Sequence, residues 1–309
     1  MKILKPKFWA KKNLLAYLLL PFSYLLQVLF KIKYTLVSQQ KLGLPIICVG
    51  NIYLGGTGKT PLSIEIASIL RELKKKPVIV KKNYSQHQDE FLLIKNKNVD
   101  LLVNSSRSEA LNEAITKNFN VAILDDGFQD KSIYKDLNIL CFNEKQLIGN
   151  GMTIPSGPLR EPVNSIKNCQ IVLINGNINK NFETKIKKLS SKISVYYSEY
   201  LPQNLDNFKG KNLLAFAGIG NPKNFFDILE SENLKIHKKI PFPDHYNYSI
   251  NELNNFISFA EKNNLEIVTT EKDFLRIKKY NLQKIKYLSI SLKIFKKEKF
   301  IEEIKSYLW

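Results

Sequence analysis

The sequence predicts an α/β protein with mainly parallel sheets in two domains. From residue 40 onward, short apolar runs alternate with helix-like segments, the pattern of a sheet whose parallel strands are joined by crossover helices. A glycine-rich loop stands between the first apolar run and the helix-like segment after it. A polar segment rich in Lys and Asn, residues 176–210, separates a first set of elements from a second. We therefore expect a domain boundary near residues 180–205.

Each expected element follows from an apolar run or from helical spacing. The first domain is expected at residues 33–195 and a smaller α/β domain at residues 196–309. In the first domain the pattern predicts strands at 44–49, 77–80, 121–124, 137–142 and 170–174 and a helix at 61–73. In the second domain it predicts strands at 212–217 and 266–269 and helices at 224–230 and 250–262.

The composition excludes a disordered chain and a disulfide framework. Of the 309 residues, 44% are hydrophobic, which is ample for packed cores. The formal net charge of +19 suggests an anionic partner, but only four of the 47 basic residues are Arg, so a general drift toward Lys explains most of it. Cys48, Cys141 and Cys169 are widely spaced, and we expect no disulfide, no Cys metal site and a reducing, cytosolic setting.

Residues 1–32 are expected to form an N-terminal membrane-associated helix. Residues 13–30 carry no charge, and lysines flank them at positions 11, 12, 31 and 33. The stretch is borderline for a membrane span of about 20 residues, and Pro21, Ser23 and Gln27 interrupt its apolar character. Lysines on both flanks favour a helix that lies in, or dips into, the cytoplasmic leaflet. The alternative is an amphipathic helix packed on the domain behind it.

The segment from Gly50 to Thr60 has the residues of a phosphate-binding loop between a strand and a helix. Its glycines let backbone N–H groups turn toward phosphate oxygens, Lys59 would reach the β- and γ-phosphates, and the Thr60 hydroxyl would bind Mg²⁺. Tyr53 stands where the strict pattern has glycine, so the match lies in the last part of the loop. We expect ATP to be bound by Gly55, Gly56, Thr57, Gly58, Lys59 and Thr60.

A pair of carboxylates follows the apolar run at residues 121–124. Asp125 and Asp126 end this predicted strand, as the carboxylates that support Mg²⁺ do in nucleotide-binding folds. Acidic strand ends are common in α/β proteins, so the phosphate loop upstream is what gives the pair its significance. Together the two features predict a P-loop NTPase-like first domain.

Several short strings in a fixed order resemble one family, the tetraacyldisaccharide 4'-kinases of lipid A biosynthesis. The resemblance covers the chain from about residue 46 to 275, and the apolar N-terminus also fits it. The matching strings are Val49-Gly-Asn51, Gly55-Gly-Thr-Gly-Lys-Thr-Pro61, Asp125-Asp-Gly-Phe-Gln129, Ile148-Gly-Asn-Gly151, Pro155-Ser-Gly-Pro-Leu-Arg-Glu-Pro162, Ala217-Gly-Ile-Gly-Asn-Pro222, Phe242-Pro-Asp-His245 and Thr269-Thr-Glu-Lys-Asp273.

The resemblance implies an ATP- and Mg²⁺-dependent kinase at the cytoplasmic face of the bacterial inner membrane. It implies two α/β domains that form a cleft, with the nucleotide on the N-terminal one and the smaller domain closing it. The acceptor would be the 4'-hydroxyl of an acylated disaccharide 1-phosphate lipid. The expected partners are this lipid and inner-membrane lipids, with no nucleic acid.

The resemblance also assigns roles to individual residues. Asp89 would be the catalytic base, assisted by His245, with Lys59 as the third catalytic residue. Glu161 would join Thr60, Asp125 and Asp126 as a metal ligand. Positioning or substrate contacts are expected from Glu90, Asp244, Arg160 and Gln129. The plainer alternatives are that His245 is a capping or surface residue and that Asp89 and Glu90 start a solvated helix.

The chain departs from the family pattern around its expected base. Residues 81–85 read Lys-Lys-Asn-Tyr-Ser where the family has Ser-Arg-Gly-Tyr-Gly, and the segment from there to Asp89 is shortened. Asp130 stands where His is common. These changes put the alignment of Asp89 in question and leave the phosphate loop untouched.

Two other functions compete with the kinase. Deviant Walker ATPases of the partitioning class, which are membrane-associated switches, end their loop in the same way, but they have a signature Lys where this chain has Leu54 and a membrane helix at the C-terminus. The third possible function is that of a membrane-bound scaffold whose nucleotide site has decayed. Transfer of label from ATP to a lipid distinguishes the three.

Overall fold

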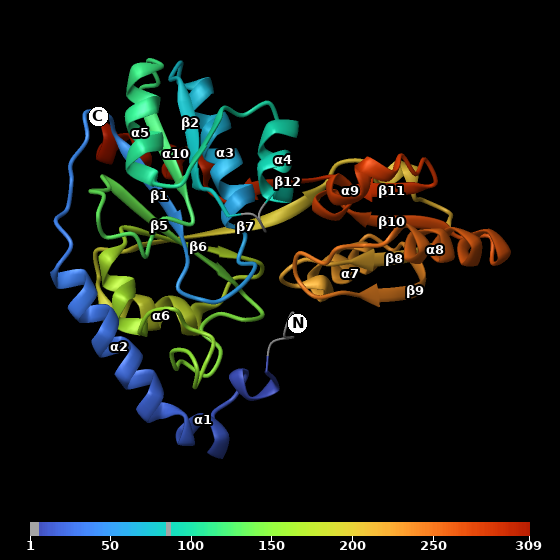
Figure 1. The fold of residues 1–309 in the computed structure, drawn as a ribbon, viewed down its shortest axis with the longest axis horizontal. Helices are drawn as coiled ribbons and strands as arrows, with labels where there is room; N and C mark the ends of the chain where they lie inside the picture. The colour runs from blue at the N-terminus through green and yellow to red at the C-terminus, as the bar shows by residue number, and fades with distance from the viewer. Residues whose placement is uncertain (1–5, 85–87) are drawn as a thin grey trace. The chain divides into compact units, whose positions relative to one another are not determined.

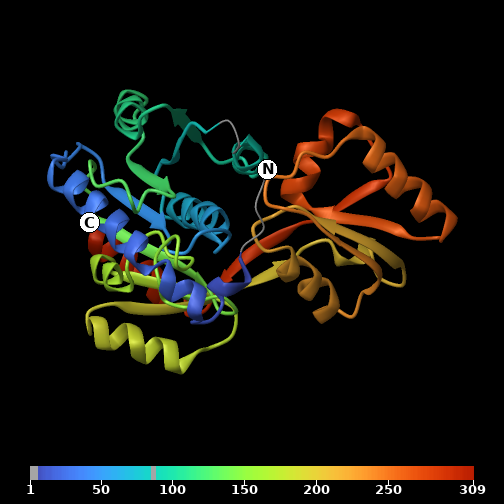
Figure 2. The same ribbon diagram turned by 60° about the horizontal axis from the view of Figure 1, so that its bottom comes forward.

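The structure, a computed structural model, describes residues 6–84 and 88–309 and divides into two compact units (Figures 1 and 2). The large unit comprises residues 6–83, 98–199 and 292–309. The small unit comprises residues 84, 88–97 and 200–291. Each unit has its own parallel sheet, so the predicted α/β class with mainly parallel strands is confirmed.

In the described residues, the large unit has an eight-stranded sheet in the order β12-β7-β6-β5-β1-β4-β2-β3, and the pairings from β7 through β3 are parallel. The first strand along the chain lies at the centre, between β5 and β4, where the strand order reverses. In open parallel sheets, ligands bind beyond the carboxyl ends of the strands at such a point. The strands are β1 (Ile46–Gly50), β2 (Pro77–Lys82), β3 (Leu101–Asn104), β4 (Val121–Asp125), β5 (Leu137–Asn143), β6 (Ile171–Asn175), β7 (Ser194–Pro202) and β12 (Ile290–Ile294).

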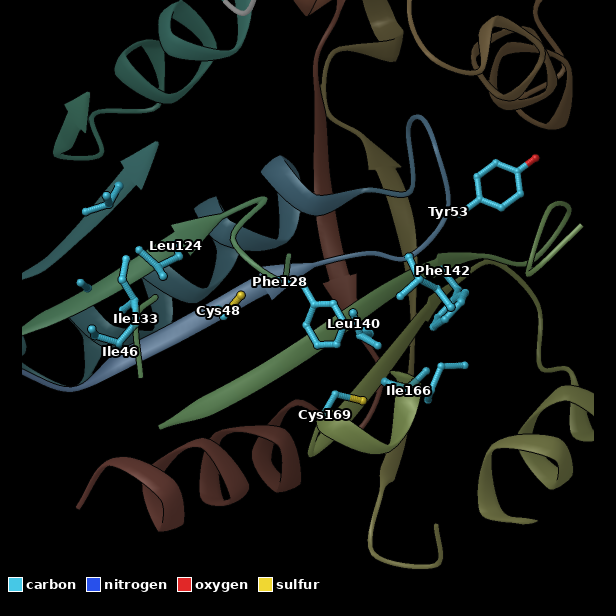
Figure 3. Close-up of a cluster of buried hydrophobic side chains, with 14 of the residues drawn as sticks. Ile46, Cys48, Tyr53, Leu124, Phe128, Ile133, Leu140, Phe142, Ile166 and Cys169 are labelled. Carbon is cyan, nitrogen blue, oxygen red and sulfur yellow. The ribbon is translucent and has the colours of Figure 1, made fainter. Parts of the chain in front are cut away.

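Strands β1, β4 and β6 are buried at every position, as expected of a parallel sheet covered on both faces. Figure 3 shows part of the core beside them, where Phe128 and Phe142 pack with Cys48 and Cys169. Burial raises the pKa of the Cys48 thiol to about 11, so it packs as an apolar side chain. The helices of this unit are α1 (Leu14–Leu18), α2 (Leu20–Thr35), α3 (Lys59–Glu72), α5 (Arg107–Thr116), α6 (Lys180–Leu189) and α10 (Lys297–Leu308), with short 3₁₀ turns η1 (Lys7–Trp9) and η3 (Val163–Asn168).

The apolar N-terminal stretch forms two helices. Pro21 lies in the first turn of α2, where its missing N–H costs no helical hydrogen bond, and α1 ends just before it. The hydroxyl of Ser23 is buried and donates to the Thr153 carbonyl at 3.0 Å, while Gln27 donates to the Thr153 hydroxyl at 2.9 Å. Within residues 6–84 and 88–309, no helix combines the length and apolarity needed to cross a membrane.

The small unit has a four-stranded parallel sheet in the order β11-β10-β8-β9 among its described residues. Alternate residues of β8 enter two cores: Leu213 and Ala215 pack with α7, and Leu214 and Phe216 pack with α8. Helices α7 and α8 accordingly cover opposite faces (Figure 2). The elements are α4 (Gln88–Asn96), η4 (Leu205–Asn207), β8 (Asn212–Ala217), α7 (Pro222–Ser231), β9 (Lys235–Pro241), α8 (Ile250–Lys262), β10 (Glu266–Thr270), α9 (Glu271–Ile277), η5 (Lys278–Tyr280) and β11 (Ile285–Leu288).

Two segments group differently from the domain limits expected from the sequence. Helix α4, expected within the domain at residues 33–195, packs against α9 of the small unit. Residues 292–309, expected in the C-terminal domain, belong to the large unit because α10 packs on β5 and buries Phe300 and Ile304 there.

Candidate active site

The phosphate loop begins where β1 ends and continues into the first two residues of α3, Lys59 and Thr60. Gly58 has φ 95°, a left-handed conformation that only glycine adopts without strain, and it turns the chain directly into the helix N-terminus. At the other end of the loop, a Cβ on Gly50 would lie 2.5 Å from the Cβ of Phe128. The segment after β4 therefore packs directly against Gly50, and there is no room for a side chain at that position.

Asn51 fixes the shape of the loop from inside. Its buried side-chain amide donates to the Tyr53 carbonyl at 2.7 Å, to the Gly55 carbonyl at 3.1 Å and to the Thr57 hydroxyl at 2.9 Å. The sequence places Asn51 in a family string but does not indicate this role. Because this one amide binds two carbonyls and a hydroxyl of the phosphate loop, it holds the backbone N–H groups of the loop in a single arrangement.

The segment after Pro155 supports the loop from outside. The Leu54 N–H donates to the Pro158 carbonyl at 2.8 Å, and the Arg160 N–H donates to the Ile52 carbonyl at 2.7 Å. Arg160 is thereby anchored through its own backbone to the loop that is expected to hold phosphate.

Asp125 lies at the end of β4, and two donors share one of its carboxylate oxygens. The Thr60 hydroxyl lies 2.8 Å and the Lys81 ammonium 2.6 Å from Oδ2. The other oxygen, Oδ1, is buried and has no hydrogen-bond partner among the residues that the structure describes. An orphaned carboxylate oxygen beside a threonine hydroxyl is a donor set that Mg²⁺ accepts, with further ligands from nucleotide phosphates and water. In the described part of the chain, no group of three His, Cys, Asp or Glu side chains could hold a metal without them.

Asp126 holds the two cations expected to bind phosphate. Arg160 Nη1 lies 2.9 Å and Lys59 Nζ 3.7 Å from its Oδ1. Burial alone raises the pKa of this carboxyl, but the charges of Lys59, Arg160 and Lys81 outweigh it, and the net pKa lies well below the usual range. Asp126 is therefore ionised at neutral pH and keeps both cations beside the loop.

Gln129 and Asp130 complete this cluster. Gln129 donates to the Asn51 carbonyl at 3.0 Å. The buried Arg107, which the sequence did not indicate, donates to the Asp130 carboxylate at 3.0 Å and to the Asp126 carbonyl at 2.7 Å. Asp130, which departs from the family pattern, is thus the partner of an arginine.

The contacts of Glu161 differ from those of the other expected metal ligands. Its carboxylate forms an ion pair with Lys131 at 3.7 Å, and the side chain is buried. Thr60, Asp125 and Asp126 lie together around the phosphate loop, whereas a metal role for Glu161 would require it to exchange this partner.

The second cluster lies in the small unit and is centred on Asp89, in the first turn of α4. Asp89 is 3% exposed. Its Oδ1 lies 3.1 Å from His245 Nδ1, and its Oδ2 lies 2.6 Å from Arg276 Nη2 and 3.5 Å from Lys272 Nζ. Burial alone raises the pKa of the Asp89 carboxyl, but the His245 hydrogen bond and the charges of Lys272 and Arg276 outweigh it and hold the net pKa well below the usual range.

His245 is held by its backbone as well as by Asp89. Its φ is 55°, an uncommon conformation for histidine, and its N–H donates to the Gly218 carbonyl at 3.1 Å. Nε2 lies 3.7 Å from Oδ1 of Asp244, whose side chain is 38% exposed. With Nδ1 directed at Asp89, His245 is oriented by a carboxylate and is not a helix cap.

Lys272 and Arg276 are the residues of this cluster that the sequence did not single out. They are separated by four positions on α9, so they face the same side of the helix. Lys272 also forms an ion pair with Glu90 at 2.9 Å, and this contact gives Glu90 its position. The family string that ends at Asp273 and the rarity of Arg in this chain were the available signals for this pair.

Comparison with known proteins gives one consistent result. The model of the family described as "Tetraacyldisaccharide-1-P 4'-kinase" matches residues 15–308, which include both clusters. The chain is 45% identical over 302 residues to the tetraacyldisaccharide 4'-kinase of Pelagibacter ubique, covering 95% of each protein, and 34% identical over 292 residues to that of Rickettsia bellii, covering 89% of this chain and 90% of the relative. Its fold is similar to the crystal structure of LpxK from Aquifex aeolicus in complex with ATP, with a TM-score of 0.75, 25% identity and coverage of 96% of this chain and 100% of the other.

Proposed function

This chain belongs to the tetraacyldisaccharide-1-P 4'-kinase family, and we propose that it transfers the γ-phosphate of ATP to the 4'-hydroxyl of an acylated disaccharide 1-phosphate. The observation that carries the proposal is the contact between Asp89 and His245 in a chain that also has a phosphate loop. A phosphate loop alone suits a nucleotide switch equally well. A buried carboxylate oriented with a histidine is what an acceptor hydroxyl requires.

The large unit provides the nucleotide half of the reaction. The N–H groups of the loop and the N-terminus of α3 bind phosphate oxygens, and Lys59 neutralises the charge on the β- and γ-phosphates. Thr60 and Asp125 would hold Mg²⁺, which when bound supplies charge neutralisation to the β- and γ-oxygens. Arg160 offers a planar guanidinium that can leave Asp126 for a phosphate oxygen.

The Asp89 and His245 pair provides the acceptor half. As the new bond forms between the hydroxyl oxygen and phosphorus, the bond from phosphorus to the β-phosphate oxygen breaks, and ADP leaves. The hydroxyl proton passes to Asp89, whose carboxylate accepts the His245 hydrogen bond and has lone pairs for a further donor. A carboxylate of low pKa is a weak base, but phosphoryl transfer has a loose transition state, for which a weak base in the correct position is sufficient.

The N-terminal helices would associate with the cytoplasmic face of the inner membrane. Many of their large apolar side chains are exposed. Lys11 and Lys12 precede α1, and Lys31 and Lys33 lie near the C-terminal end of α2, which supports a helix lying at the headgroup level. Ser23 and Gln27 hold α2 to the loop at Thr153, so lipid contact is made by the other side chains. The exposed members are Leu14, Leu15, Tyr17, Leu18, Phe22, Tyr24, Leu25, Val28, Leu29, Phe30, Ile32 and Leu36.

Transfer of label tests this function against a switch ATPase. The full chain is incubated in detergent with γ-labelled ATP, Mg²⁺ and the acylated disaccharide 1-phosphate. We expect label in the lipid, and its complete absence in Lys59→Ala. Label that appears only as free phosphate would instead support the partitioning-class ATPase, which the family match over residues 15–308 disfavours.

A further inference from the structure

Arg276 connects the carboxylate of Asp89 to the interior of the small unit. Its side chain is 11% exposed and uses both ends of the guanidinium. Nη2 lies 2.6 Å from Asp89 Oδ2, while Nη1 lies 2.6 Å from Asp273 Oδ1 and 2.7 Å from the Gly218 carbonyl. A planar fork bound at both ends has a fixed plane, so the oxygen that it holds is fixed as well.

Asp273 is a rigid anchor for this fork. The carboxylate is fully buried and accepts the Thr270 hydroxyl at 2.6 Å, the Gly218 N–H at 3.0 Å and the Tyr248 hydroxyl at 3.0 Å. These donors come from the N-cap of α9, the residue that follows β8 and the segment before α8. Each carboxylate oxygen of Asp273 therefore accepts at least one hydrogen bond from a residue other than Arg276.

Gly218 contacts two of the partners of Asp89, His245 and Arg276. Its carbonyl accepts both Arg276 Nη1 at 2.7 Å and the backbone N–H of His245 at 3.1 Å. A Cβ at this position would lie 2.6 Å from the Tyr248 hydroxyl, so there is no room for a side chain. One carbonyl thus sets the positions of the groups that hold Oδ1 and Oδ2 of the carboxylate.

We propose that Arg276 is a positioning residue of the reaction, which orients the Asp89 carboxylate from Oδ2 while His245 orients it from Oδ1. This inference rests on the function proposed above. Lys272 does not replace it, because its ammonium is farther from Oδ2 and is shared with Glu90. A point charge on a flexible stem neutralises the carboxylate without fixing its plane.

Arg276 also contributes to the charge balance that keeps Asp89 ionised. The charged and titratable groups around this carboxylate come from α4, α9 and the segment before α8. The opposite charge of Arg276 lowers the pKa of the Asp89 carboxyl, so its loss moves the acid limb of the rate profile to higher pH. The groups are Glu90, Asp244, His245, Lys272, Asp273 and Arg276.

The test compares Arg276→Gln and Arg276→Lys with Arg71→Gln, a matched change at an exposed arginine paired with Asp100. We measure kcat, the KM for ATP, the pH profile of kcat and the melting temperature of the full chain. For Arg276→Gln we expect kcat to fall by about 100-fold, because a small misplacement of a reacting group has that effect. We also expect the KM of Arg276→Gln for ATP to stay within about twofold of the wild-type value. The acid limb of its kcat profile should move to higher pH.

Arg276→Lys keeps the charge but loses the fork, so we expect a lower kcat with the acid limb nearly in place. Added guanidinium ion should restore part of the turnover of Arg276→Gln, and urea should not. The inference is overturned if folded Arg276→Gln turns over like the wild type, or if activity only follows the fraction of folded protein and the pH profile is unchanged. A wild type that transfers no label refutes the proposed function itself, which is a separate result.

Discussion

Nδ1 of His245 lies 3.1 Å from Oδ1 of Asp89, although 156 residues separate the two in the chain. Asp89 lies in the first turn of α4, and His245 lies in the segment between β9 and α8. The pair is therefore assembled by tertiary structure within one unit. Both residues are also held by neighbouring groups, Asp89 by Arg276 and His245 by the Gly218 carbonyl, which makes the pair a sensitive target for substitution.

Replacing Asp89 by Asn should lower kcat by about 10²–10⁴-fold, because the proton acceptor is lost while the shape is kept. The KM for ATP should change little, since the nucleotide binds at the phosphate loop. Steady-state kinetics with varied ATP and lipid measures both. Asp100→Asn, at an exposed carboxylate, is the control. Turnover near the wild-type value in Asp89→Asn would mean that the shortened segment before it has been misaligned.

Lys59→Ala should abolish detectable nucleotide use, because its ammonium is the charge that reaches the β- and γ-phosphates. The measurement is the equilibrium affinity for a non-hydrolysable ATP analogue together with kcat. Lys117→Ala removes a similar charge from an exposed pair with Glu113 and should leave both unchanged. Unaltered ATP affinity and turnover in Lys59→Ala would remove the loop from the mechanism.

Lys81→Met should destabilise the protein by about 3–5 kcal/mol when neither Mg²⁺ nor ATP is present, because it leaves the buried Asp125 carboxylate without its cation. Addition of Mg²⁺ and ATP should recover part of this loss, since a metal ion at Asp125 supplies positive charge. Urea unfolding with and without the ligands measures the difference. An equal destabilisation under both conditions would argue against Mg²⁺ at Asp125.

The stability contribution of Asp126 should depend on pH. The pKa of this carboxyl is lowered in the folded protein, so its contribution is present above the unfolded value of about 4 and is lost as pH falls through the folded value. Asp126→Asn should therefore melt below the wild type at pH 7, and the gap should narrow below about pH 4. Thermal melts across that range measure the gap. A gap that stays constant or widens in acid would contradict this sign.

Exposed apolar side chains of α2 should mediate binding to lipid. Changing Phe22, Leu25 and Leu29 to Ser should weaken sedimentation with anionic vesicles by at least about tenfold, because each loses roughly 1.5–3 kcal/mol of apolar burial in the lipid. Ser23→Ala removes buried hydrogen bonds to Thr153 and Ser156 but no exposed apolar side chain, so it should retain vesicle binding. If the triple variant still sediments, the basic surface would be the attachment site.

The phosphate loop could be predicted from sequence because its chemistry is local. The glycines, Lys59 and Thr60 are adjacent in the chain, and β1 before them is buried at every position, so it reads as an uninterrupted apolar run. The predicted strands at 121–124 and 212–217 follow from the same signal. Strand β9 has no such signal, because it is largely exposed and contains three lysines.

The grouping of α4 with the small unit could not be read from the sequence. Helix α4 lies between two strands of the large sheet in chain order, and its contact with α9 depends on residues more than 170 positions away, as in the bond between Asn96 and Glu271. Arg276 was missed for the same reason. Its role comes from Asp89 and Gly218, neither of which is near it in the chain.

The central claim is tested most directly by locating the phosphate that the enzyme adds. Lipid labelled from γ-labelled ATP is treated with mild acid, which removes a phosphate at the anomeric position and leaves a phosphate ester on a sugar hydroxyl. We expect the label to remain with the disaccharide and to depend on Asp89, His245 and Lys59. Label that is released by the acid, or that never enters the lipid, would contradict a 4'-kinase.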